Sequence, residues 1–125
     1  MNKQAYIPKV VDWARIRGYS NIKANAEGYS IPGSYGRQGD GESFIPDVTG
    51  QQFDRKSYFE VILKTKDTEY LTVKLKLLYQ LALLNGGQLF LMAPKGHSTF
   101  AKAMADNNRI TAEIIVLDEI KSKAR

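Results

Sequence analysis

The sequence predicts an α/β fold, a small mixed β-sheet flanked by helices. Predicted strands and helices alternate after residue 57, which is typical of parallel βαβ units. The earlier strands are joined by turns, which favours antiparallel pairing. The chain has 125 residues, 43% hydrophobic and 25% charged, enough for one hydrophobic core. We therefore expect a single domain over residues 1–118 and a polar tail over residues 119–125.

The first part of the chain predicts a helix, a short strand and a long loop. Apolar residues recur at helical spacing over residues 3–17, and Gly18 follows as a stop signal. Residues 21–26 form a candidate strand. Residues 28–43, "GYSIPGSYGRQGDGES", hold half of the 10 glycines and predict a loop. A loop this long in a compact domain is usually functional or disordered.

The middle of the chain predicts two strands and the turn between them. Residues 44–50 form a candidate strand that has a proline near its middle. Residues 51–56, "QQFDRK", are expected to turn. Residues 57–64 are rich in β-forming residues and predict the second strand.

The last part of the chain predicts alternating helices and strands. A helix is expected over about residues 69–85, with Asp67 or Thr68 as its N-cap and "NGG" as its stop signal. The remaining predicted elements are a strand over residues 88–93, a helix over residues 99–108 and a strand over residues 111–117. The predicted order is α-β-β-β-α-β with a further helix and strand.

The composition excludes several kinds of chemistry. The chain has no cysteine and one histidine, which excludes disulfides, cysteine nucleophiles and the usual zinc sites. Its most apolar run, "LKLLYQLALL", is too short to cross a bilayer, and no secretory signal is recognisable. We therefore expect a cytoplasmic protein with no membrane partner. The net charge of +5 and pI near 9.4 favour a polyanion such as nucleic acid.

Two carboxylates are the main candidates for chemistry. Asp47 lies on one predicted strand and Glu60 on the next, across a turn. If these strands pair as a hairpin, both side chains converge at one edge of the sheet. Two hard oxygen ligands suit Mg²⁺ or Mn²⁺, which also take water and phosphate oxygens. Such an ion can orient water and neutralise charge on a phosphate.

The motif around these carboxylates resembles the PD-(D/E)xK nuclease superfamily. Pro46-Asp47 is followed by Glu60 inside the apolar stretch "FEV", and the element order over roughly residues 3–117 is similar to the restriction-endonuclease-like core. The resemblance implies metal-dependent hydrolysis of phosphodiester bonds in nucleic acid, with DNA as the first expectation. It implies that Asp47 and Glu60 bind the metal, and it allows a homodimer in which two sites address two strands.

One position departs from the family pattern. The family lysine falls at position 62, where this chain has Ile62. Lys64 lies on the same strand face as Glu60, but about 13 Å away along the strand. Lys74 falls within the apolar stripe of the following helix, where a lysine is costly unless its amine reaches water or a carboxylate. Lys74 is therefore the preferred replacement for the catalytic lysine, and Lys64 the second candidate.

Five further residues are candidates for binding. Glu27 could act as a third metal ligand, since many nucleases of this type carry another acid near the first helix. Tyr35 and Arg37, in the glycine-rich loop, could contact the phosphate backbone. Lys95 and His97 precede the helix over residues 99–108 and could bind an anion with its N-terminus.

Two other interpretations stay open at this stage. The loss of lysine at position 62 is also expected of a catalytically degenerate domain that binds nucleic acid or a protein partner. A basic α/β protein-interaction module with no nucleic acid ligand is the second. In these cases Asp47 is a turn-edge residue, Glu60 a solvated strand carboxylate, and Lys74 a side chain that extends to the helix rim.

Overall fold

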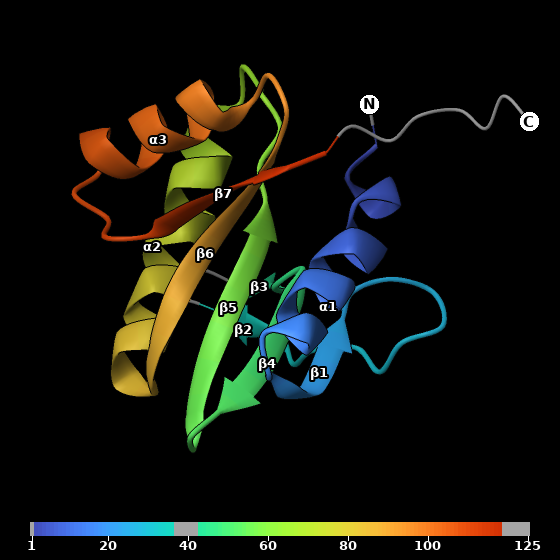
Figure 1. Cartoon of the computed structure of the whole chain (residues 1–125). Helices are drawn as coiled ribbons and strands as arrows, with labels where there is room; N and C mark the ends of the chain where they lie inside the picture. Colours follow the sequence, from blue (N-terminus) through green and yellow to red (C-terminus); the bar gives the residue numbers. More distant parts are fainter. Residues whose placement is uncertain (1, 37–42, 119–125) are drawn as a thin grey trace, which may run out of the picture.

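The computed structural model describes residues 2–36 and 43–118 and has an α/β fold (Figure 1). A 5-stranded mixed sheet has the order β1-β4-β5-β6-β7, and β2 and β3 form a separate 2-stranded sheet. The elements are a 3-10 turn η1 (Lys3–Ala5), α1 (Ile7–Ile16), β1 (Ser20–Ala24), β2 (Tyr35–Gly36), β3 (Ser43–Phe44), β4 (Val48–Gln52), β5 (Arg55–Val61), α2 (Thr68–Leu84), β6 (Gly86–Pro94), α3 (Ser98–Asn107) and β7 (Glu113–Leu117). The predicted α/β class and mixed sheet flanked by helices are confirmed.

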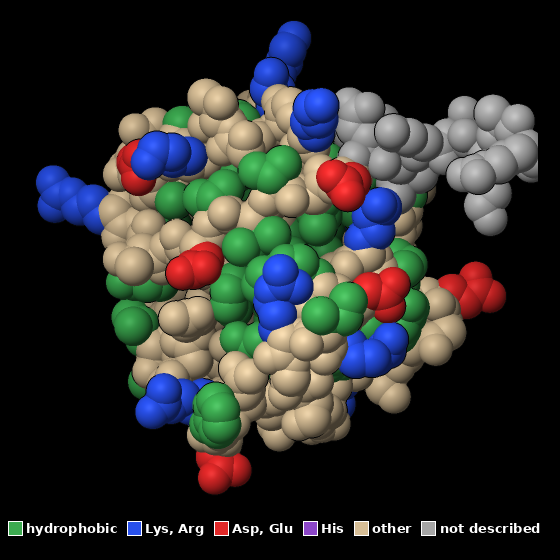
Figure 2. Space-filling view, in the orientation of Figure 1, with side chains coloured by type: hydrophobic (Ala, Val, Ile, Leu, Met, Phe, Trp, Pro, Cys, Tyr) green, Lys and Arg blue, Asp and Glu red, His purple; other side chains and the backbone are tan. Residues whose placement is uncertain are grey.

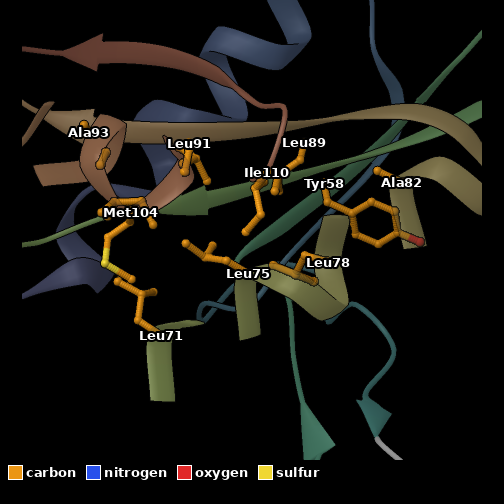
Figure 3. Close-up of a cluster of buried hydrophobic side chains, with 13 residues drawn as sticks. Tyr58, Leu71, Leu75, Leu78, Ala82, Leu89, Leu91, Ala93, Met104 and Ile110 are labelled. Atoms are coloured by element: carbon orange, nitrogen blue, oxygen red, sulfur yellow. The ribbon is translucent and has the colours of Figure 1, made fainter. Parts of the chain in front are cut away.

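Helices cover both faces of the large sheet (Figure 1). Helix α1 packs its apolar side on one face, against side chains that include Phe59 and Val61 of β5. Helices α2 and α3 pack on the other face, where Tyr58 and Ile62 point (Figure 3). Side chains alternate between the two faces along a strand, so Glu60 is directed towards the α2 layer.

The β4–β5 hairpin is tighter than the predicted six-residue turn. Gln52 pairs with Arg55, which leaves Phe53 and Asp54 as the whole turn. Their φ angles of 54° and 61° lie in the left-handed region, as a type I′ turn requires. This turn type matches the twist of the flanking strands and therefore determines their register.

The predicted strand over residues 44–50 is divided in two. Phe44 belongs to β3 and pairs with Tyr35 of β2, whereas β4 begins at Val48 and pairs with β1 and β5. Pro46 lies between the two strands and has no N–H group to donate to a sheet ladder. Part of the predicted glycine-rich loop therefore forms the small β2–β3 sheet.

The second half of the sheet is parallel, as predicted. Strand β6 pairs parallel with β5, and β7 pairs parallel with β6. The order α-β-β-β-α-β over α1, β1, β4, β5, α2 and β6 is thus present, with α3 and β7 as the further helix and strand. Within residues 2–36 and 43–118, no helix is long and apolar enough to cross a membrane.

Candidate functional site

A cavity of about 400 Å³ lies where β5 ends, α2 begins and the β6–α3 turn passes. Crevices at the carboxyl ends of parallel strands are common ligand sites in α/β folds. The lining residues are Lys3, Glu60, Val61, Leu63, Lys64, Thr65, Asp67, Tyr70, Leu71, Lys74 and His97. Four of the residues singled out from the sequence therefore share one cavity: Glu60, Lys64, Lys74 and His97.

Asp47 and Glu60 lie opposite each other across the hairpin. Asp47 directly precedes β4, whose first residue Val48 pairs with Phe59, the residue before Glu60. The Asp47 backbone N–H donates to Glu60 Oε1 at 3.0 Å, and Asp47 Oδ2 accepts from the Val61 N–H at 2.8 Å. The two residues are 2% and 0% exposed, so the hairpin holds both carboxylates in fixed, buried positions.

Lys74 reaches this pair from α2. Its side chain is 8% exposed, and its Nζ lies 2.5 Å from Glu60 Oε2. Ile62, the strand position where a lysine was expected, is fully buried and packs with α2 residues such as Leu75. The ammonium near Glu60 thus comes from the helix and not from the strand.

Lys3 is a site residue that the sequence did not indicate. Its Nζ lies 3.0 Å from Asp47 Oδ2 and 3.0 Å from Glu60 Oε2. Lys3 belongs to η1, at the start of the chain, and no spacing or periodicity relates it to the hairpin. Glu27, expected as a third acid, is exposed in the turn after β1 and does not line the described cavity. The first segment therefore brings a cation to the carboxylates where an acid was expected.

The two carboxyl groups have opposite pKa shifts. Burial, reinforced by the Glu60 charge, raises the pKa of Asp47 from 3.8 to about 6, against the opposing effect of Lys3 and Lys74. Burial by itself would also raise the pKa of Glu60. The ammonium groups of Lys3 and Lys74 together have the larger effect, so the pKa of Glu60 is lowered from 4.5. Burial would lower the pKa of Lys3, but the charges of Glu60 and Asp47 raise it. The site thus holds two carboxylates and two amines.

Lys64 and His97 join two loops at the cavity rim. The Lys64 backbone N–H donates to His97 Nδ1 at 2.8 Å. Because an N–H can only donate, Nδ1 carries no proton, and the imidazole proton is on Nε2. Lys95 is exposed in the same β6–α3 turn but does not line the described cavity.

Tyr35 does not line the described cavity. Tyr35 Oη accepts a hydrogen bond from Lys56 Nζ at 2.7 Å, and its ring meets the Tyr58 ring edge-on at 6.2 Å. Tyr35 thus packs over β5 beside Tyr58, on the same face as Glu60. Arg37 lies outside the described residues.

The site offers a hard divalent ion two carboxylate ligands, of which Glu60 but not Asp47 lines the described cavity. Asp47 Oδ2 and Glu60 Oε2 already converge on one positive charge, the Lys3 ammonium. Among residues 2–36 and 43–118, no group of three or more His, Cys, Asp or Glu side chains could hold a metal. Mg²⁺ and Mn²⁺ accept one or two carboxylates and complete their shells with water and phosphate oxygens, whereas zinc sites need more protein ligands.

Other surfaces of the described protein offer less chemistry. A second hollow of about 340 Å³, at the other end of α2, is lined by residues such as Tyr79, Leu83 and Glu113 and contains no pair of facing carboxylates. Figure 2 shows Lys and Arg side chains dispersed over one face, with Asp and Glu among them. The buried Asp47–Glu60 pair with its lysines is therefore the strongest candidate site.

Comparison with known proteins supplies no relative: no family model matches the chain, and a search of curated proteins finds no match.

Proposed function

We propose that this protein is a metal-dependent nuclease of the PD-(D/E)xK type that hydrolyses phosphodiester bonds in nucleic acid, with DNA as the first substrate to test. The observation that carries the proposal is the convergence of two buried carboxylates, Asp47 and Glu60, on one cation at the end of β5. A third group, the Lys74 ammonium, contacts Glu60.

Each of these residues has a chemical role in the proposal. Asp47 Oδ2 and Glu60 Oε2 would hold Mg²⁺ or Mn²⁺, which when bound supplies charge to neutralise a phosphate and orients a water. Glu60 also fixes the Lys74 ammonium at the cavity wall. From there Lys74 supplies the positive charge that Ile62 cannot and stabilises negative charge as it develops on the phosphate.

The rim of the cavity supports binding of a phosphate backbone. Lys64 has an exposed side chain, and His97 presents an N–H at Nε2, because its Nδ1 accepts the Lys64 N–H. Both are suitable donors to phosphate oxygens. A homodimer would place two such sites on two strands of a duplex. Sedimentation at assay concentration measures whether the protein is a dimer.

The second candidate is a catalytically degenerate domain of the same fold that binds nucleic acid or a protein. One observation favours it: two amines match the two carboxylates. Among the described residues, every buried side-chain nitrogen or oxygen has a hydrogen-bond partner. A closed polar network of this kind orders the interior of a fold without any metal.

A cleavage assay separates the two candidates. Single-stranded, duplex and branched DNA, and RNA, are incubated with the protein and Mg²⁺ or Mn²⁺, with EDTA as the metal-free control. We expect metal-dependent cleavage that falls about 100-fold or more in Asp47→Asn and Lys74→Gln, a usual scale for loss of a charge-stabilising group. Lys76→Gln is the matched control, because Lys76 is exposed on the same helix.

The outcomes are distinct. Cleavage that survives Asp47→Asn refutes the proposed site. Salt-dependent binding of nucleic acid with no cleavage favours the degenerate domain. Circular dichroism of each variant confirms that it is folded.

A further inference from the structure

We propose that Lys3 is a built-in competitor of the divalent ion, so that metal binding to Asp47 and Glu60 requires the Lys3 ammonium to leave them. The inference rests on the metal-binding part of the proposed function and concerns how the site is loaded. It assigns Lys3 as the residue that sets the affinity of the site for a divalent cation.

Lys3 occupies an acceptor position on each of the two converging oxygens. A carboxylate oxygen offers about two lone-pair positions. Asp47 Oδ2 accepts from the Val61 N–H and contacts Lys3, whereas Glu60 Oε2 contacts both Lys74 and Lys3. Both oxygens are thus fully used, and Lys3 is the partner they share. A metal that binds both oxygens therefore takes the place of Lys3.

Of the partners of these two oxygens, Lys3 is the one best placed to move. The Val61 N–H belongs to the backbone of β5, and the Lys74 side chain is 8% exposed. The Lys3 side chain is 34% exposed and lines the cavity, so its ammonium has a route to solvent. Lys3 is the partner whose release disturbs the core least.

Segment η1, which carries Lys3, is short. The turn is three residues long, and the polar bonds described for it run from the Gln4 N–H to Asn2 Oδ1 and from Gln4 Nε2 to the Asn25 carbonyl, both at exposed positions. The apolar attachment of this segment begins with the buried Tyr6 and Ile7. Residues before Tyr6 are therefore able to shift while α1 stays packed.

The net charge around the two carboxylates changes when Lys3 leaves. With Lys3 in place, two carboxylates face two amines, and the local charge attracts a further cation weakly. With Lys3 displaced, Asp47, Glu60 and Lys74 carry a net charge of −1, which favours a divalent ion. Buried charges are poorly screened, so this difference acts strongly on metal affinity.

The first experiment measures Mn²⁺ binding by the electron paramagnetic resonance signal of the free ion, at neutral pH and without substrate. We expect Lys3→Gln to bind Mn²⁺ at least about 10-fold more tightly than the wild type. Lys9→Gln is the matched control, because it removes the same charge from α1, and we expect a change of less than about twofold. Unchanged or weaker binding by Lys3→Gln overturns the inference.

The second experiment uses the wild-type chain and does not depend on whether a variant folds. Lysine acetylation is followed by mass spectrometry with and without saturating Mg²⁺. We expect Lys3 to react at least about fivefold faster with Mg²⁺ present, while the exposed Lys102 serves as the internal control. A Lys3 that stays equally protected at saturating Mg²⁺ overturns the inference.

The two proposals fail in different ways. If Lys3→Gln binds Mn²⁺ tightly but no nucleic acid is cleaved, the proposed nuclease activity is refuted and the proposed competition by Lys3 stands. Cleavage by the wild type with no effect of Lys3→Gln on Mn²⁺ binding removes the role of Lys3 and leaves the nuclease. Absence of Mn²⁺ binding in both proteins overturns the inference on Lys3.

Discussion

The Lys74 ammonium of α2 contacts Glu60 Oε2 of β5 across the helix–sheet interface. Both side chains are buried, so their contact is shielded from water. Ile62, the residue that follows the end of β5, packs among apolar side chains on the same side of the sheet, which include those of α2. The helix therefore supplies the charge and Ile62 supplies packing.

Removing Lys74 is expected to destabilise the fold. Lys74→Met leaves Glu60 buried with Lys3 as its remaining ammonium partner, and loss of one partner of a buried ion pair costs about 3–5 kcal/mol. Because Lys3 remains, we expect a decrease of roughly 2–4 kcal/mol in the free energy of unfolding, measured with urea. Lys76→Met, on the exposed side of the helix, should change it by less than about 0.5 kcal/mol. Equal stability of the two variants would contradict the buried pair.

A lysine at position 62, where the PD-(D/E)xK pattern has one, is expected to destabilise the fold. Ile62 is 0% exposed, so Ile62→Lys places an ammonium among apolar side chains of the α2 layer. We expect a loss of roughly 3–5 kcal/mol in the free energy of unfolding, because the charge is buried without a designed partner. Thr65→Lys, at an exposed position, is the control. An Ile62→Lys protein as stable as this control would show that the strand has room for the lysine.

The raised pKa of Asp47 predicts a pH dependence of stability. Between its ordinary pKa of 3.8 and its folded value of about 6, the folded protein binds a proton that the unfolded chain has released. The free energy of unfolding therefore falls as pH rises through this window on account of Asp47. The lowered pKa of Glu60 has the opposite effect on the free energy of unfolding, and this effect falls below pH 4.5. Stabilities are therefore compared from pH 4.5 upwards.

Asp47→Asn tests this dependence. From pH 4.5 to 7, the stability of the wild type relative to Asp47→Asn should fall by roughly 1–3 kcal/mol, at about 1.4 kcal/mol per unit of pKa shift. Urea unfolding at constant ionic strength measures the gap at each pH. A gap that stays constant over this range would show that Asp47 keeps its ordinary pKa.

Substitution of the two hairpin-turn residues is expected to stabilise the fold. Phe53 is 84% exposed, and both turn residues have positive φ angles, which non-glycine residues adopt at a cost of about 1 kcal/mol or more. Phe53→Asn with Asp54→Gly supplies the preferred type I′ pair and should raise the free energy of unfolding by about 1 kcal/mol. Phe53→Ala is the control, because it removes the same apolar ring but does not introduce a residue that favours the type I′ turn. A loss of stability in the Asn-Gly variant would show that the turn is of another type.

Local patterns in the sequence determined much of the candidate site. The helical period placed Lys74 within the buried stripe of α2, and pairing of the two predicted strands as a hairpin was the condition under which Asp47 and Glu60 would converge. Both results depend on neighbours within one element or one tight turn, where the period of side-chain directions is enough to assign a face. The same patterns indicated the α/β class and the element order, because alternation and helical spacing are local properties.

The tertiary structure decided what local patterns do not encode. Lys3 and Glu60 are 57 positions apart in the chain, and their contact exists only because α1 packs on the sheet and carries η1 to the end of β5. The bond between Lys64 and His97 likewise depends on two loops that meet only after β6 has paired with β5. The sequence by itself therefore identified the two carboxylates and one of their cations. The second cation, which shares both carboxylates, became visible only when packing brought distant segments together.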